Sequence, residues 1–446
     1  MAEPLAESCG PWLAERARLD ADAPALTSAT GTLSWRALSE RVETLADRLT
    51  ALGVARGDRV VVVLGTCVRL VELVHAAQRC VATLVLLDPR LAASEVAVLL
   101  AHADPVLVLH DRPFPVAAPT AQARVVGVHN TLDAVVPVRA PAPTLVDPTA
   151  VQTILYTSGT TGRPKGVMLT HANQRASAAA SRAHLGVRAD DRWLVALPLN
   201  HVGGLSIVMR SVLDGTPLVL HERFDAAAVW QAIDDERITL LSIVPTMLHR
   251  LLEHADGAAR GTSLRAVLVG GAALAPALAE RARAVGLPIL PTYGLTETGS
   301  QVATSALDGS ATDAATTVGR PLGTTRVRID DADDEGRGEI VVAGPTVMAG
   351  YFRDPEATAY VLRDGWLHTG DIGRLDAAGC LQVFDRRTDV VISGGENVYP
   401  AEVEAVLLAH PAVGEAAVYG APDPEWGRRV QAAVVLRDGA AVDAAT

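Results

Sequence analysis

The chain contains 446 residues, of which 49% are hydrophobic and 20% are charged. This length exceeds what one hydrophobic core usually supports, so we expect a globular protein of two or more domains. The formal net charge is −12, which argues against general binding of nucleic acids or anionic membranes, because both require a basic surface.

Helix and strand patterns alternate from the N-terminal region onward. Apolar residues at helical spacing predict a helix over 33–52, and the apolar run 59–65 that follows predicts a buried strand. A second helix over 68–81 then leads to a strand at 83–87. This alternation is typical of α/β layering around a largely parallel sheet. The segment 113–146 is rich in Ala, Pro and Val and lacks periodicity, so we expect a surface excursion there.

Short apolar runs continue the strand pattern beyond residue 150. Strands are expected at 151–156, 193–197, 217–220, 240–244 and 266–269, and then, between turn signals, at 325–329, 338–342 and 381–384. The expected fold class is therefore α/β. A large N-terminal domain over 1–385 would combine parallel α/β sheets with a β-rich subdomain at about 318–385, and a small α+β C-terminal domain over 386–446 would follow.

The cysteines and the apolar stretches bear on the cellular compartment. Cys9, Cys67, Cys80 and Cys380 are scattered, without the spacing of a zinc site or a disulfide framework, which favours free thiols in a reducing cytosol. The first dozen residues lack the features of a signal peptide, and charges interrupt the most apolar stretch. We expect a cytoplasmic protein without membrane insertion, and the sequence leaves its oligomeric state open, a homo-oligomer included.

The segment 156–167 reads YTSGTTGRPKGV and carries the clearest chemical signal. Its glycines, threonines and serine offer backbone N–H groups and hydroxyls that can surround phosphate oxygens. The segment also holds Lys165, the single lysine among 39 lysines and arginines. Arg163 and Pro164 before it break the Walker A pattern. We interpret the segment as a phosphate-binding loop of another kind.

Three further segments follow in order: TYGLTETG at 292–299, GWLHTGD at 365–371 and DRRTDVVISGGENVYPAEVE at 385–404. Together with the loop, they resemble the signatures of the adenylate-forming superfamily, which comprises acyl- and aryl-CoA synthetases, luciferases and the adenylation domains of peptide synthetases. The resemblance covers about residues 10–446. It implies that a carboxylate attacks the α-phosphate of ATP, releasing pyrophosphate, and that the thiol of coenzyme A then displaces AMP from the acyl-adenylate.

The resemblance also implies roles for individual residues. The catalytic set is Lys165, His201, Thr296 and Glu297, and the ATP- and AMP-binding set is Thr157, Ser158, Gly159, Thr160, Thr161, Gly162, Gly271, Ala272, Ala273, Tyr293, Gly294, Asp371 and Arg386. Glu297 is a hard oxygen ligand suited to Mg²⁺. Asp371 and Arg386 would contact the ribose, and adenine would lie between Tyr293 and the segment 271–273, for which a plain strand–helix turn is an alternative interpretation.

The C-terminal segment supplies two further expectations. Thr388 occupies the position of the hinge about which the small domain of relatives rotates, although many relatives carry Asp or Lys there. Gly394 and Gly395 lie in a loop that relatives bring against coenzyme A.

The acid substrate is indicated by the segment from 193 to 220. His201 resembles a gate residue beside the reacting carboxylate, and Gly204 is assigned to the same acid site. Arg210 lies in an apolar helical pattern, so it either serves an anionic ligand or extends its charge to the surface. Four segments, 193–220, 239–248, 289–302 and 385–411, are most similar to those of the o-succinylbenzoate–CoA ligases of menaquinone biosynthesis. The substrate of those ligases is a dicarboxylate, and Arg210 would hold its second carboxylate. A ligase for another small aromatic or alicyclic acid is the alternative.

One departure from the superfamily pattern concerns a second lysine. Relatives carry a catalytic lysine near the end of the C-terminal domain, and this chain has none up to Thr446. The expectation is a truncated chain or a natural protein impaired in adenylation. The second case leaves open a non-catalytic protein that binds nucleotides or acyl-adenylates, although the intact loop and TET motif argue against it.

Overall fold

The structure is a computed structural model of the whole chain. It describes residues 10–112, 123–139, 141, 145–157, 164–254, 263–307, 317–386, 391–393, 396–398, 400–423, 427–437 and 439–440. Within these residues, no helix has both the length and the apolar character needed to span a bilayer.

A seven-stranded sheet organises the first part of the chain, in the order β18-β8-β7-β4-β3-β5-β6. Its strands are β3 (Arg59–Val63), β4 (Thr83–Leu87), β5 (Leu107–His110), β6 (Arg124–Gly127), β7 (Val151–Thr157), β8 (Lys165–Thr170) and β18 (Gly350–Tyr351). The strands from β7 to β6 run parallel, whereas β8 is antiparallel to β7 and β18 is antiparallel to β8. The valine-rich run of β3 and the leucine-rich run of β4 suit strands buried on both faces.

A nine-stranded sheet lies beside it, in the order β15-β14-β13-β12-β11-β9-β10-β1-β2. Its strands are β1 (Pro24–Ser28), β2 (Gly31–Ser34), β9 (Trp193–Val195), β10 (Leu218–Leu220), β11 (Leu240–Ile243), β12 (Ala266–Val269), β13 (Ile289–Leu295), β14 (Ser300–Thr304) and β15 (Arg320–Pro321). The strands from β1 to β13 are parallel across the centre, and antiparallel strands close both edges.

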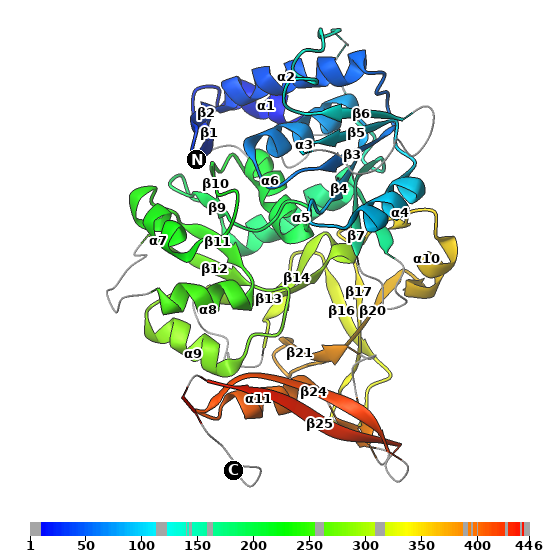
Figure 1. Cartoon of the computed structure of the whole chain (residues 1–446). Helices are drawn as coiled ribbons and strands as arrows, with labels where there is room; N and C mark the ends of the chain where they lie inside the picture. The colour runs from blue at the N-terminus through cyan, green and yellow to red at the C-terminus, as the bar shows by residue number, and fades with distance from the viewer. Residues whose placement is uncertain are drawn as a thin grey trace.

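Helices cover both sheets and fill the space between them (Figure 1). They are α1 (Trp12–Leu19), α2 (Trp35–Ala51), α3 (Val68–Cys80), α4 (Ala93–Ala103), α5 (His171–Leu185), α6 (Val202–Asp214), α7 (Ala226–Asp235), α8 (Pro245–Glu253), α9 (Pro276–Ala284), α10 (Pro355–Val361), α11 (Pro400–Leu408) and the 3₁₀ turn η1 (Thr296–Thr298). Residues 204–214 of α6 are all buried, because this helix lies between the two sheets.

A β-rich sheet and a small C-terminal unit complete the chain. The sheet comprises β16 (Arg326–Asp330), β17 (Gly338–Ala343), β19 (Leu362–Arg363), β20 (Trp366–Leu375) and β21 (Leu381–Arg386), all antiparallel. The C-terminal unit comprises α11 and the strands β22 (Val391–Ser393), β23 (Glu396–Val398), β24 (Val413–Asp423) and β25 (Gly427–Leu436). Figure 1 shows the hairpin β24–β25 below β21.

The α/β fold class is confirmed, with a large N-terminal part and a smaller C-terminal part. Two segments differ from the sequence prediction. β6 lies inside 113–146, where a surface excursion was expected, and it pairs in parallel with β5. The helix predicted over 33–52 begins only at Trp35, because Leu33 and Ser34 belong to β2 and the Ser34 hydroxyl caps the helix. The domain division at 385 and 386 stays a prediction.

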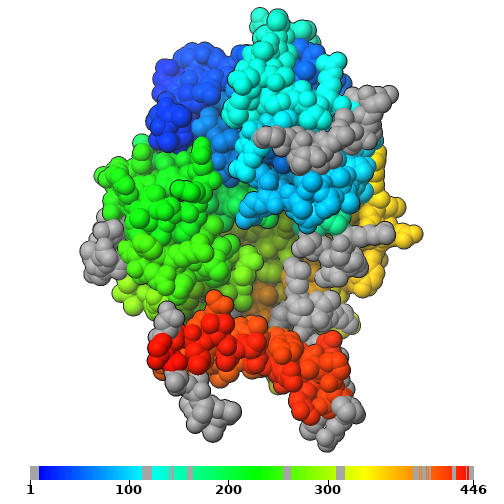
Figure 2. All heavy atoms as spheres, viewed as in Figure 1, coloured from blue at the N-terminus to red at the C-terminus, as the bar shows by residue number. Residues whose placement is uncertain are grey.

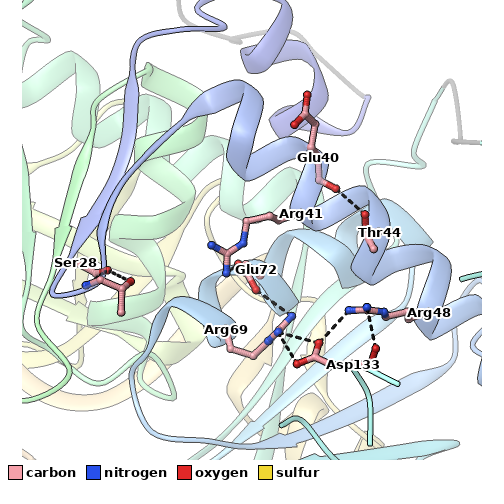
Figure 3. A network of polar contacts seen from close by, with 9 residues as sticks. Ser28, Glu40, Arg41, Thr44, Arg48, Arg69, Glu72 and Asp133 are labelled. Carbon is pink, nitrogen blue, oxygen red and sulfur yellow. Dashed lines mark hydrogen bonds and ion pairs between the residues drawn. The ribbon is translucent and has the colours of Figure 1, made fainter. Parts of the chain in front are cut away.

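Charged side chains tie α2 to α3 (Figure 3). Glu72 is fully buried and lies 2.6 Å from Arg41 and 3.2 Å from Arg69. Arg69 and Arg48 also contact Asp133, at 3.0 and 2.9 Å. Burial raises the pKa of Glu72, and the two arginines oppose that shift. Removing one partner of such a buried pair usually destabilises a protein, because the other charge stays desolvated.

Two buried histidines make folding sensitive to acid. His75 of α3 and His171 of α5 are only 3% and 5% exposed, and burial lowers the pKa of each from 6.5 to about 4. Below pH 6.5 the unfolded chain therefore binds protons that the folded chain does not. The stability that depends on these neutral rings is present above pH 6.5 and is lost as the pH falls towards 4.

We predict that His75→Gln reduces the loss of unfolding free energy between pH 7 and pH 5 by about 2 kcal/mol, because it removes one of the groups that resist protonation when folded. Denaturant unfolding at both pH values measures this loss. The matched control is His249→Gln at an exposed position of α8. Its unfolding free energy should decrease between pH 7 and pH 5 by the same amount as that of the unmodified chain. An equal loss in His75→Gln and the unmodified chain would contradict the prediction.

Candidate functional site

Several parallel strands end close to the predicted site residues. β4 ends just before Asp88, β9 ends a few residues before His201, and β12 leads into Gly271. Open α/β sheets bind ligands at such carboxyl ends. Figure 2 shows a recess between the green and the cyan parts of the chain, above the orange-red C-terminal segment.

The phosphate-binding loop is anchored by an antiparallel strand pair. Thr157, the last residue of β7, lies opposite Lys165, the first residue of β8. The ladder therefore fixes both ends of the loop side by side. Five predicted nucleotide-binding residues lie outside the described part of the chain: Ser158, Gly159, Thr160, Thr161 and Gly162. Thr157 and Lys165 stay half-exposed, where a ligand can reach them.

Thr296 and Glu297 lie on η1, in a tight turn between β13 and β14. The Thr298 hydroxyl donates to the Leu295 and Ser300 carbonyl oxygens, which fixes the turn. Gly294 is required for the close approach of the strands, since an added Cβ would collide with the Ser300 carbonyl group. Both predicted side chains remain half-exposed at the end of this turn.

Sequence reasoning missed Tyr351. Its hydroxyl donates to Glu297 Oε1 at 2.9 Å, and its ring centroid lies 5.0 Å from Lys165 Nζ. The structure thus brings Lys165 and Glu297 to the same phenol, although they are separated by more than a hundred residues. The sequence offered only a weak signal, namely that a tyrosine in a buried segment usually needs a partner for its hydroxyl.

The residues around Glu297 suit a magnesium site. Mg²⁺ is commonly held by one or two carboxylates together with substrate phosphates and waters. Glu297 supplies one half-exposed carboxylate, and Tyr351 donates to only one of its two oxygens. Within the described residues, no group of three or more His, Cys, Asp or Glu side chains could hold a metal by itself. The donor set therefore fits a cation that is shared with a nucleotide.

Asp371 and Tyr293 meet between the nine-stranded and the β-rich sheets. The buried Tyr293 hydroxyl donates to Asp371 Oδ2 at 2.6 Å. The Asp371 N–H donates to the Thr369 hydroxyl, which sets the backbone at this point of β20. Arg386 lies opposite Asp371 in the β20–β21 register, and its side chain lies outside the described residues. Tyr293 therefore reaches the predicted ribose carboxylate with its hydroxyl.

The predicted adenine segment follows β12. Gly271 has a φ of +82°, and Gly271, Ala272 and Ala273 are exposed. An added Cβ at Gly270 would lie 2.8 Å from the Thr292 carbonyl oxygen, so this turn packs against the start of the TYG motif. The segment is a strand–helix turn, as the alternative interpretation held, and it is also open to a ligand.

His201 is the N-cap residue of α6 and lies on the surface. Desolvation by the surrounding chain lowers the pKa of its imidazole, the Asp88 carboxylate opposes this shift, and Arg90 adds to it. The ring is therefore favoured in its neutral form. Gly204, in the first turn of α6, packs against the loop before it, since an added Cβ would lie 2.8 Å from the Leu197 carbonyl oxygen and nearer still to that of Pro198.

Arg210 is 3% exposed, so the alternative that its charge reaches the surface is wrong. Its Nη2 donates to Ser300 Oγ at 3.2 Å, and its guanidinium lies 6.0 Å from the Trp193 ring centroid. Burial lowers the pKa of Arg210 to about 10, and Asp214 opposes the shift. Ser300 has a φ of 114°, a backbone conformation that a residue with a side chain rarely adopts.

The structure does not describe the residues that were predicted to form the hinge and the coenzyme A contact. Thr388, Gly394 and Gly395 lie outside the described residues. The hinge and coenzyme A assignments at these positions stay predictions.

Comparison with known protein families gives two matches. The family model described as AMP-binding enzyme matches residues 13–352, and the model described as AMP-binding enzyme C-terminal domain matches residues 402–446. The chain belongs to the AMP-binding enzyme family. Within that family, the chain is 41% identical to the 2-succinylbenzoate–CoA ligase of Bacillus licheniformis over 423 residues, which cover 94% of this chain and 87% of the relative.

Solved structures of the family agree in fold. An o-succinylbenzoate CoA synthetase from Bacillus subtilis, in complex with its acyl-adenylate intermediate, matches with a TM-score of 0.91 and 37% identity, covering 97% of this chain and 89% of the other. The same synthetase in complex with ATP and a magnesium ion also matches with a TM-score of 0.91 and 37% identity, covering 97% of this chain and 90% of the other.

Adjacent glycines of α6 allow a matched test of the packing beside His201. We predict that Gly204→Ala lowers the unfolding free energy by about 1–3 kcal/mol, because its Cβ meets backbone carbonyl groups that cannot move freely. Gly203→Ala is the control, since its Cβ meets only the Leu197 Cδ1 at 3.3 Å. It should be neutral or stabilising by up to about 1 kcal/mol, because alanine favours a helix over glycine. Equal unfolding free energies for the two variants would refute this account.

Proposed function

We propose that this chain is an acid–CoA ligase that forms AMP and pyrophosphate and acts on 2-succinylbenzoate in the cytoplasm. The single observation that carries the choice of acid is the Arg210 guanidinium, buried beside Ser300 directly after the TETG segment. A buried cation next to the adenylation motif suits a substrate that keeps a second negative charge while its first carboxylate reacts. The similarity to 2-succinylbenzoate–CoA ligases supports the same choice.

In the first step, the substrate carboxylate attacks the α-phosphate of ATP, and pyrophosphate leaves with the electron pair of the P–O bond, so that an acyl-adenylate forms. Lys165 would neutralise phosphate oxygens, and the Thr296 hydroxyl would donate to the α-phosphate. Glu297 would hold Mg²⁺, which when bound supplies positive charge to the phosphates. Asp371 offers carboxylate oxygens to the ribose hydroxyls, and the exposed turn at 271–273 offers a surface for adenine. Most of the catalysis in this step is positioning and charge stabilisation, because the enzyme forms no covalent bond with the substrate.

In the second step, the thiol of coenzyme A attacks the acyl carbon, and AMP leaves with the electron pair of the C–O bond. His201, at the start of α6, would stand beside the reacting acyl group. A neutral imidazole suits this place, since it can accept the proton that the thiol loses and does not pair permanently with the substrate carboxylate. Gly394 and Gly395 remain proposed contacts of coenzyme A.

The reaction itself provides the first test. We predict that the protein, incubated with ATP, Mg²⁺, 2-succinylbenzoate and coenzyme A, yields AMP, pyrophosphate and a 2-succinylbenzoyl thioester, as measured by liquid chromatography with mass spectrometry. Benzoate should react at least tenfold more slowly, because it has no second carboxylate to pair with the buried Arg210 guanidinium. Thioester formation from benzoate-type monoacids but not from 2-succinylbenzoate would sink the substrate assignment. Nucleotide binding without turnover of any acid, even after a C-terminal segment that carries the second lysine is added, would contradict the assignment as a ligase.

Arg210 provides a second test. We predict that Arg210→Met lowers kcat/KM for 2-succinylbenzoate by about 30-fold or more, because a charged hydrogen bond to the second carboxylate is lost. The rate with benzoate should change far less. The control is Arg182→Met, which removes another cation near Asp214, where Arg182 Nη1 lies 2.7 Å from Asp214 Oδ1. It should leave the preference between the two acids intact. The assignment fails if both variants reduce the two activities in parallel.

A further inference from the structure

Three segments that are distant in the chain meet at Tyr351. β8 begins at Lys165, η1 carries Glu297, and β18 ends at Tyr351. The Tyr351 hydroxyl donates to Glu297 Oε1 at 2.9 Å, and the Tyr351 ring centroid lies 5.0 Å from Lys165 Nζ. One phenol therefore contacts both the proposed metal ligand and the proposed phosphate-binding cation.

The backbone fixes this phenol in place. Tyr351 pairs with Val167 of β8, and its N–H donates to the Thr358 hydroxyl at 2.8 Å. The Met348 N–H donates to the Glu297 carbonyl oxygen at 2.8 Å, which ties the segment before β18 to η1. Tyr351 is only 7% exposed. The packing of three segments therefore fixes the position of the Tyr351 hydroxyl, and the side chain is not free to turn into the solvent.

We infer that Tyr351 is a positioning residue that keeps the Glu297 carboxylate and the Lys165 ammonium apart and directed at the ligand. Opposite charges that share one neighbour attract each other and would pair directly, which would occupy the groups that Mg²⁺ and phosphate need. The hydroxyl takes Oε1 and leaves Oε2 to a cation. The ring face offers Lys165 a weak cation–π contact that a phosphate can replace.

This inference rests on the proposed function, because it assigns Glu297 to the metal and Lys165 to the phosphates. It goes further by giving a role to a side chain outside the four sequence signatures. Within the part of the chain that the structure describes, the contact found for Lys165 Nζ is with this ring. The inference therefore separates two effects of one side chain: the hydroxyl acts on metal binding, and the ring acts on the lysine.

Metal affinity tests the hydroxyl without any turnover. We expect Tyr351→Phe to raise the Kd of Mn²⁺ about tenfold in the presence of α,β-methylene-ATP, as measured by electron paramagnetic resonance, because Glu297 loses a charged hydrogen bond. Affinity for the metal-free analogue should stay within about twofold. Tyr360→Phe, at an exposed position of α10, is the control and should match the unmodified chain. An unchanged Kd for Mn²⁺ in Tyr351→Phe would overturn the inference.

A double-variant cycle distinguishes an effect that acts through Glu297 from a general effect of the substitution on packing. In a Glu297→Gln background, Tyr351→Phe should cause no further loss of Mn²⁺ affinity, because the carboxylate that it positions is gone. A further tenfold loss there would show that the phenol acts elsewhere and would overturn the inference. If the unmodified chain binds no Mn²⁺ with the analogue, the proposed function fails together with this inference. Normal binding by both the unmodified chain and Tyr351→Phe would sink the inference alone.

The ring is tested through the chemistry of the single lysine. Trinitrobenzenesulfonate reacts with amines, and peptide mapping separates Lys165 from the N-terminal amine. Tyr351→Phe keeps the ring and should leave the reaction rate of Lys165 within about twofold. Tyr351→Leu removes the ring and should raise the rate about threefold, since an exposed cation–π contact restrains the ammonium by a comparable factor. Equal rates in these two variants would contradict a role for the ring.

Discussion

The candidate site depends on one buried side-chain amide, that of Asn173 in the first turn of α5. Its Nδ2 donates to the carbonyl oxygens of Pro345 and Val347, at 2.9 and 2.8 Å. One turn further along, the Ser177 hydroxyl donates to the Gly299 carbonyl oxygen at 2.7 Å. Because α5 follows directly from β8, the strand that begins at the single lysine, these neutral hydrogen bonds bring β8, the TET turn and the segment before β18 together. The charged groups then meet without having to hold the structure themselves.

Much of the fold could be predicted because its core segments carry strong local patterns. α3 and β4 follow their apolar runs almost residue by residue. β6 could not be predicted, since its four residues RVVG show no alternation of apolar and polar residues. They form a strand because they pair with β5. The site divides in the same way. The motifs located Lys165 and Glu297, whereas Tyr351 and Ser300 take their significance from partners 54 and 90 residues away.

Several charged side chains lie in the interior around α6. Arg210 and Asp214 lie one turn apart on a helix that is buried on every side, and Arg182 satisfies the carboxylate from α5. At the C-terminal end of α6, the fully buried Arg16 donates to the carbonyl oxygens of residues 212 and 213. That arginine satisfies carbonyl groups that a helix end leaves without partners. Helix α6 can therefore carry a cation through an apolar core, because its other polar groups have partners.

Gly294 was assigned to nucleotide binding because of the motif that contains it, yet its surroundings set a different requirement. An added Cβ would lie 2.6 Å from the Ser300 carbonyl carbon and 3.0 Å from the Gln301 Cα, which are backbone atoms. Glycine is therefore required at position 294 by the lack of space for a Cβ atom, whatever role the residue has in nucleotide binding. A mutant with a larger residue would lose the hairpin whichever acid or nucleotide the enzyme used. During evolution, substitutions in α6 could change the acid that the enzyme accepts. The turn beside α6 would still have to keep Gly294, because its backbone leaves no room for a side chain.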